Sequence, residues 1–179
     1  MPVAIEGLPT ISRDYFELFQ LPVDFDLDLD ELAGRFRALQ RKFHPDRFAS
    51  QGVGERRAAA QLSADINSGY RILGDPVARA GFMLERLGRD LKALEREPVE
   101  GSFLMRQMEL REALRALETS DAETRAEVVA EARALMDEAV AGFRAAISND
   151  DLTTAGGFYV QLLYLKKLHT EVAITGEPV

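Results

Sequence analysis

The fold is decided by a ten-residue stretch, RKFHPDRFAS (residues 41–50), in which a His-Pro-Asp turn follows a basic segment. Proline pushes the residue before it out of the helical conformation, so Pro45 predicts that a helix ends here. The chain has only two histidines, and one of them, His44, lies in this turn. His44 and Asp46 are therefore candidates either for chemistry or for presentation to another molecule.

The segment before the turn, LDLDELAGRFRALQRKF (residues 27–43), predicts an amphipathic helix. Its apolar residues recur at steps of three and four, and Asp28 and Glu31 have the spacing of a capping box. A rotation of 100° per residue places four cations opposite the apolar stripe. An ordinary solvated face is the alternative, but this arc is nearly all of one sign. The stripe consists of Leu29, Leu32, Phe36, Leu39 and Phe43, and the arc of Arg35, Arg37, Arg41 and Lys42.

The segment after the turn, ERRAAAQLSADINSGYRIL (residues 55–73), predicts a second helix that GDP (residues 74–76) ends. Upstream of both, DYFELFQLP (residues 14–22) predicts one short helix closed by Pro22. The expected arrangement is a short helix and then a helical hairpin with HPD at its tip. The apolar positions of the second hairpin helix are Ala59, Leu62, Ile66, Tyr70 and Leu73.

The second half of the chain also reads as helix, which makes the expected fold class all-α. A helical stretch over residues 79–94 runs into KALEREPVEG (residues 92–101), a linker or hinge. Three long helical patterns follow, joined by short loops, and predict an antiparallel three-helix bundle. Ser120 and Glu123 have capping-box spacing, and NDD (residues 149–151) signals a turn and cap. The three patterns cover residues 102–118, 120–147 and 151–172.

Composition limits the class of protein. An apolar fraction of 46% in 179 residues supports a real core, and a net charge of −8 argues against general nucleic-acid binding. Residues 10–80 carry 10 Lys+Arg against 11 Asp+Glu, whereas residues 81–179 carry 12 against 18. Two differently charged partners are therefore plausible. With no apolar run long enough for a membrane, no secretion or transit signal and no cysteine, the cytoplasm is the expected compartment.

An enzyme built on His44 and Asp46 is the first functional alternative. A catalytic His needs an orienting partner and a nucleophile or metal, but Pro45 fixes the backbone between these two residues. The other histidine, His169, falls near the apolar face of the last helix, where a core role is expected. Phosphate-loop, Ser-His-Asp and HExxH patterns do not occur. The sequence therefore predicts no enzyme; a metal-dependent hydrolase and a purely structural helical adaptor stay as alternatives.

The other reading is that the proline-fixed turn is itself a recognition element. YFELFQLP, the basic helix into HPD, and INSGYRILGDPVARA (residues 66–80) together resemble a J-domain, the module by which co-chaperones stimulate ATP hydrolysis by DnaK-class chaperones. The resemblance implies that the turn contacts the chaperone ATPase near its interdomain linker and that the cations supply an electrostatic face. The implied chaperone-binding residues are His44, Pro45, Asp46, Arg37, Arg41, Lys42 and Arg47.

FLMRQMELREALRALE (residues 103–118) shows two apolar faces on a helical projection rather than one. The last helix repeats this, with Val160 and Tyr164 opposite its core face of Ala155, Phe158, Leu162 and Leu165. A cluster rimmed by carboxylates suggests a docking surface, while a second core contact is the alternative. The core stripe of the first helix is Phe103, Leu110, Leu114 and Leu117, and its opposite face carries Leu104, Met105, Met108, Glu109 and Glu112.

A J-domain joined to an acidic three-helix bundle with this motif resembles the HscB family of J-type co-chaperones of iron–sulfur cluster assembly, over about residues 14–168. The resemblance implies a J-domain at 12–80 and a connecting helix and linker at 81–101. It also implies that residues 102–172 form the family's C-terminal oligomerisation-type domain, which binds an iron–sulfur scaffold protein. Tyr164 stands where Phe is common, and Ala116 where an acidic residue is. The implied scaffold-binding residues are Leu104, Met105, Met108, Glu109, Glu112 and Tyr164.

In that family the bundle binds the scaffold IscU and the J-domain presents it to the chaperone HscA, whose ATPase it stimulates. The resemblance therefore implies these two partners, no membrane or nucleic-acid partner, and a bacterial, cytoplasmic member. It also implies no cofactor and no metal, because the cluster's thiolates would reside on the scaffold. A general J-protein that delivers other clients is the nearest alternative.

Overall fold

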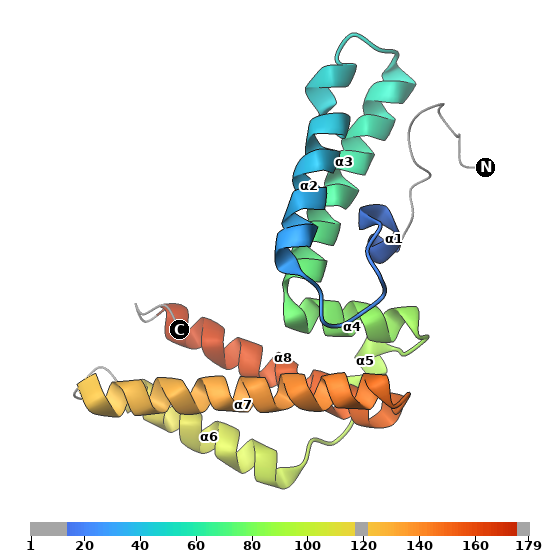
Figure 1. Ribbon diagram of the computed structural model, residues 1–179. Coiled ribbons are helices and arrows are strands. Elements are labelled where there is room, and N and C mark those ends of the chain that lie inside the picture. Colours follow the sequence, from blue (N-terminus) through green and yellow to red (C-terminus); the bar gives the residue numbers. More distant parts are fainter. Residues whose placement is uncertain (1–13, 117–121, 175–179) are drawn as a thin grey trace. The chain divides into compact units, whose positions relative to one another are not determined.

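Helices make up the regular structure of the residues described below. The computed structural model describes residues 14–116 and 122–174, with side chains as far as Leu168, and no strand occurs among these residues. The chain divides into two compact units between Phe82 and Met83. This all-α architecture confirms the fold class predicted from the sequence (Figure 1). No helix within 14–116 and 122–174 combines the length and apolar character needed to cross a membrane.

The first unit is built on the hairpin of α2 (Leu29–Phe43) and α3 (Val53–Gly74), which lie side by side in Figure 1. α2 begins where the sequence predicts, because the Asp28 carboxylate accepts hydrogen bonds from the backbone N–H groups of Asp30 and Glu31, at 2.9 and 3.0 Å. Such a cap satisfies backbone donors that a helix start otherwise leaves unpaired. The expected helical hairpin is therefore confirmed.

The short helix α1 (Tyr15–Phe19) packs on this hairpin at a glycine. A Cβ atom added to Gly69 of α3 would lie 2.7 Å from the Tyr15 ring and 2.8 Å from the Phe19 ring, so only glycine permits this approach. α1 ends at Phe19, before Pro22, and its C-cap is Gln20, whose φ is +54°. The largest fully buried side chains of this unit are Phe16, Phe19, Leu32, Leu62, Ile66 and Leu73.

Two residues expected on the apolar stripes are exposed, and Phe36 and Leu39 are half-buried. Leu29 is the first residue of α2 and is 52% exposed, whereas Leu32, three residues later, is 1% exposed. Tyr70 is 36% exposed and stacks on the Phe36 ring with centroids 4.2 Å apart. The Tyr70 ring thus covers the edge of the hairpin core while its hydroxyl can stay in water.

α4 (Pro76–Arg86) is fastened to the first unit by a buried cation. Asp75 caps it, accepting a hydrogen bond from the Ala78 N–H at 2.7 Å. Arg79 is 7% exposed, donates to the Leu73 carbonyl and lies over the Phe25 ring at 5.1 Å. Burial lowers the pKa of Arg79, although nearby aspartates oppose this effect.

The helix expected over residues 79–94 is interrupted, which corrects the sequence prediction. α4 ends at Arg86, and Gly88 adopts φ +82°, a left-handed conformation that stops the helix. α5 (Leu91–Leu94) then starts from its own cap, Asp90. The sequence reading missed that Gly88 followed by an Asp cap is a stop and restart signal.

The second unit contains α6 (Gly101–Arg115), α7 (Ala122–Ser148) and α8 (Leu152–Ile174), and each contacts the other two (Figure 1). This confirms the three-helix bundle. The NDD turn is confirmed as well, since Asp150 has φ +55° and the Asp151 carboxylate caps α8. Hydrogen bonds from Thr154 lower the pKa of Asp151. The expected cap at Ser120 lies outside the described residues.

Close packing within the second unit depends on two glycines. A Cβ atom on Gly142 of α7 would lie 2.2 Å from the Phe158 ring, and one on Gly156 of α8 would lie 2.7 Å from a Leu94 methyl group. The bundle core includes the predicted Phe103, Leu110, Ala155, Leu162 and Leu165, while Phe158 and Leu114 are only half-buried. Leu117 and the His169 side chain, both predicted to face the core, lie outside the described part.

Candidate functional site

The HPD turn follows directly from the end of α2. The helix ends at Phe43, as predicted, and His44 is extended, with φ −61° and ψ +131°. This conformation is the one that a following proline imposes. Pro45 then starts a short 3₁₀ helix, η1 (Pro45–Phe48), because its fixed φ suits a first helical position.

His44 and Asp46 are held by local hydrogen bonding and face solvent. The Asp46 backbone N–H donates to His44 Nδ1 at 3.3 Å, and His44 Nδ1 lies 3.5 Å from Asp46 Oδ2. The side chains of His44 and Asp46 are 53% and 90% exposed. When Nδ1 accepts a hydrogen bond, the proton of a neutral imidazole is on Nε2. The turn therefore offers an Nε2–H donor and a carboxylate acceptor to a partner.

The cations next to the turn remain available on the surface. Arg37, Arg41, Lys42 and Arg47 are exposed. Arg47 Nη1 donates to the Arg41 carbonyl at 3.2 Å, which ties η1 to the last turn of α2. The Lys42 ammonium lies 5.0 Å from the Phe43 ring centroid. The structure thus places all seven residues of the predicted chaperone site within one turn and its adjoining helix.

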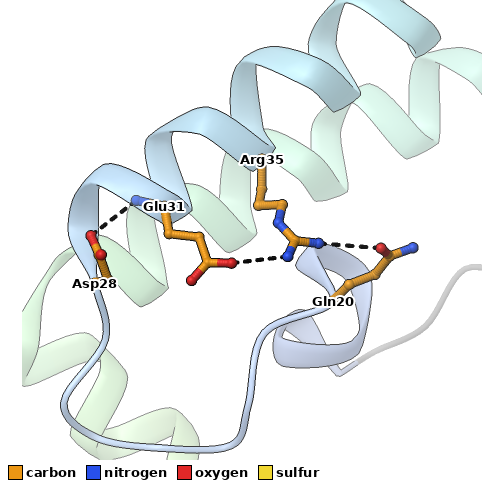
Figure 2. Close-up of polar contacts among 4 residues, drawn as sticks. All are labelled: Gln20, Asp28, Glu31 and Arg35. Atoms are coloured by element: carbon orange, nitrogen blue, oxygen red, sulfur yellow. Dashed lines mark hydrogen bonds and ion pairs between the residues drawn. The ribbon is translucent and has the colours of Figure 1, made fainter.

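Arg35 belongs to the predicted arc but points to other partners. Figure 2 shows its guanidinium between Glu31, at 2.9 Å, and the Gln20 side chain, at 3.3 Å. Arg35 is thereby paired within the unit and joins α2 to the end of α1. An exposed i,i+4 pair of this kind contributes only about 0.3–0.5 kcal/mol, so its main consequence is to remove one cation from the free face.

A second surface lies on α6, opposite its buried stripe. Met105 and Met108 are 64% and 60% exposed, which excludes the core-contact alternative for these two side chains within the bundle. Leu104 is half-buried beside them, and Glu109 and Glu112 are exposed. Soluble proteins seldom leave several large apolar groups together in water unless the patch binds something.

Tyr164 of α8 meets α6 at Phe103. The two rings meet edge to face, with centroids 6.4 Å apart, and Tyr164 is 37% exposed. The Lys167 ammonium lies 5.9 Å from the Tyr164 ring centroid. We call Leu104, Met105, Met108, Glu109, Glu112 and Tyr164 the methionine patch.

The core-contact alternative holds for Val160, and two supporting residues were missed. Val160 was expected on the outer face with Tyr164 but is 4% exposed, because that side of α8 also packs within its unit. Phe103, assigned only to the core, supports the Tyr164 ring. Lys167 could have been found from its position three residues after Tyr164, a spacing at which helical side chains meet.

The chain offers little for metal or acid-base chemistry in its described part. Within residues 14–116 and 122–174, no group of three or more His, Asp or Glu side chains is placed to hold a metal ion. His44 has Asp46 beside it and cations around it, and the interactions found for it are those of a turn.

Comparison with known proteins relates most of the chain to one group. Residues 99–173 match the family described as the HSCB C-terminal oligomerisation domain. The chain is 37% identical over 162 residues to the co-chaperone protein HscB homolog of Vibrio cholerae, covering 89% of this chain and 94% of that protein. The homolog of Neisseria meningitidis is 36% identical over 160 residues, covering 89% and 96%.

Solved structures show the same similarity. Chaperone HscB from Vibrio cholerae matches with a TM-score of 0.79 at 35% identity, over 90% of this chain and 96% of that one. Human co-chaperone protein HscB matches with a TM-score of 0.85 over 96% and 86%, and at 24% identity it supports the fold alone. The similarity thus extends across both units.

Proposed function

Because the chain belongs to the HscB family of co-chaperones, as its sequence predicted, we propose that it acts as a co-chaperone of iron–sulfur cluster assembly. It binds an IscU-type scaffold, delivers it to an HscA chaperone of the DnaK class and stimulates that chaperone's ATPase. The carrying observation is that one chain exposes two surfaces of different chemistry, a cationic HPD turn and the methionine patch. The J-domain is assigned to 12–80, the connection to 81–101 and the scaffold-binding domain to 102–172.

At the chaperone end, the HPD turn is a rigid element presented at low entropic cost. Pro45 fixes the backbone between His44 and Asp46, so little freedom is lost when a partner binds. The exposed cations beside it steer a partner whose surface is acidic. The bond that breaks is in the chaperone's nucleotide, so this chain contributes binding and orientation and no catalytic group.

At the scaffold end, the methionine patch combines apolar anchors with an acidic rim. Methionine side chains are flexible and polarisable, which suits a surface that has to fit a partner. Glu109 and Glu112 favour a partner with cations around an apolar centre. The cluster itself remains on the scaffold, because this chain has no cysteine to supply thiolate ligands.

Joining the two surfaces in one chain raises the scaffold's effective concentration at the chaperone. Chaperone ATP hydrolysis then holds the scaffold and promotes transfer of its cluster to acceptor proteins. A J-protein serving other clients would stimulate the chaperone equally but would gain nothing from the scaffold.

The test is the chaperone's steady-state ATPase rate, measured with this protein, with an IscU-type scaffold and with both. We expect the combined stimulation to exceed the sum of the separate ones. A rate unchanged by this protein would contradict the J-domain assignment. Stimulation that is indifferent to the scaffold would instead favour the general J-protein.

A further inference from the structure

The second unit contains a cleft that neither docking surface uses. Two adjoining hollows, of about 290 and 310 Å³, open between the segment before α6 and the three bundle helices. They share Glu100, Phe158 and Gln161 in their walls, and we refer to the two neighbouring hollows together as the cleft. Volumes of this size suit one or two side chains of a peptide.

The cleft has an aromatic wall that the fold maintains. The Phe158 ring lies against Gly142 of α7, where a Cβ atom would come within 2.2 Å of it, and lines both hollows. Phe103 lines the larger hollow. The Phe158 ring can occupy this position only because residue 142 has no side chain. Gly142 of α7 therefore sets the position of the Phe158 ring.

Two successive glycines in α8 have different explanations. Gly156 is required by packing, since a Cβ atom there would meet a Leu94 methyl group at 2.7 Å. A Cβ atom on Gly157 would meet nothing within 4 Å, yet Gly157 is in the helix interior and lines the cleft. Glycine at such a position costs about 1 kcal/mol relative to alanine. No contact among the described residues requires a glycine at position 157. A partner whose chain approaches the α8 backbone closely at this point would require one.

The charge of the cleft indicates what fits it. Its walls carry Glu97, Glu100 and Glu138 against one cation, Arg106. Arg106 pairs with Glu138 at 3.3 Å, and Glu100 accepts a hydrogen bond from the Ser102 hydroxyl at 2.6 Å. The net negative charge around an aromatic wall favours a segment with an apolar side chain next to a lysine or arginine.

The cleft adjoins Tyr164, the α8 member of the methionine patch. Gly157, Gln161 and Tyr164 are spaced i, i+4 and i+7 on α8 and therefore lie along one strip of the helix. Gly157 and Gln161 line the cleft, and Tyr164 belongs to the patch. Phe103 connects them a second time, because it lines the larger hollow and contacts Tyr164. A partner on the patch can extend into the cleft without leaving the bundle.

We infer that the cleft is a second contact for the scaffold and takes a short extended segment in which an apolar side chain adjoins a lysine or arginine. The inference rests on the proposed function, since the scaffold is the partner assigned to the neighbouring patch. The apolar side chain packs against Phe158 over Gly157, and the cation pairs with Glu97 or Glu100.

The test is calorimetric titration of full-length Gly157→Leu with the scaffold. The new side chain fills the cleft and should weaken scaffold binding about tenfold. Because leucine favours helix and a Cβ atom there meets nothing, this variant should melt no lower than the wild type. Glu97→Lys should weaken binding severalfold through its reversed charge.

The matched control is Gly34→Leu in α2, another helix-interior glycine with open space around its Cβ position. It should leave scaffold affinity unchanged. Wild-type affinity in Gly157→Leu, with weakened binding in Met108→Ala, would overturn the cleft and leave the proposed function standing. Absence of scaffold binding by the wild type would overturn the proposed function, and the cleft assignment with it.

Discussion

The HPD turn and the methionine patch are both exposed, but they are built in opposite ways. In the turn, the backbone positions the side chains. Pro45 fixes the backbone conformation, and the Asp46 N–H donates a hydrogen bond to His44, so polar groups are presented with little conformational freedom. In the patch, a regular helix carries flexible side chains, Met105 and Met108, on a face that its bundle does not cover. The turn therefore suits recognition by direction and charge, and the patch suits recognition by apolar area.

This difference predicts that each surface fails separately, and most completely at the turn. His44→Gln should reduce chaperone ATPase to its basal rate, because it replaces the imidazole, which the Asp46 N–H holds through Nδ1, with a flexible amide. Scaffold affinity by calorimetry and helix content by circular dichroism should both stay at wild-type values. ATPase stimulation that persists in this variant would contradict the assignment of the turn as the chaperone-binding site.

The matching change in the patch is Leu104→Ala combined with Met108→Ala. Truncating one central apolar anchor costs on the order of 2 kcal/mol, about 30-fold in affinity, and the pair should lose at least this much. ATPase stimulation without scaffold should be intact. Leu87→Ala is the control, since Leu87 is in the same unit, 47% exposed and outside the patch. Normal scaffold binding by the double variant would refute the patch as a docking site.

Two arginines of α2, one exposed and one paired with Glu31, test whether a directed cationic face acts in chaperone binding. Arg37→Gln should raise the concentration needed for half-maximal ATPase stimulation by about three- to tenfold, since it removes an exposed steering charge. Arg35→Gln, the same change at a residue paired with Glu31, should have less effect. Added salt should weaken chaperone stimulation more than scaffold binding. Equal effects of the two substitutions would argue against a directed cationic face.

The smallest expected effect concerns the N-terminal cap of α2, the helix that leads into the turn. Asp28→Ala removes the α2 cap and should lower the free energy of unfolding by about 1 kcal/mol, measured by urea denaturation. Stimulation at 25 °C should be unchanged, because the cap is at the other end of α2 from His44. A loss of stimulation without a loss of stability would mean that Asp28 itself contacts the chaperone.

The sequence predicted the hairpin, the bundle and the exposure of both surfaces because these depend on periodicity, proline and caps. It erred where packing decided the outcome. Val160 has the spacing of an outer residue but is buried, and Leu29 has the spacing of a core residue but is exposed. Gly156 and Gly157 look alike in the sequence, and only the position of Leu94 separates them.

The central claim is that the two surfaces act through one chain. It is tested by mixing His44→Gln protein, whose patch is intact, with the Leu104→Ala/Met108→Ala protein, whose turn is intact, and measuring chaperone ATPase with scaffold present. The account predicts only the sum of the separate effects, whereas wild-type protein gives more than the sum. A mixture that reached the wild-type rate would contradict it, because the tether between the surfaces would then be dispensable.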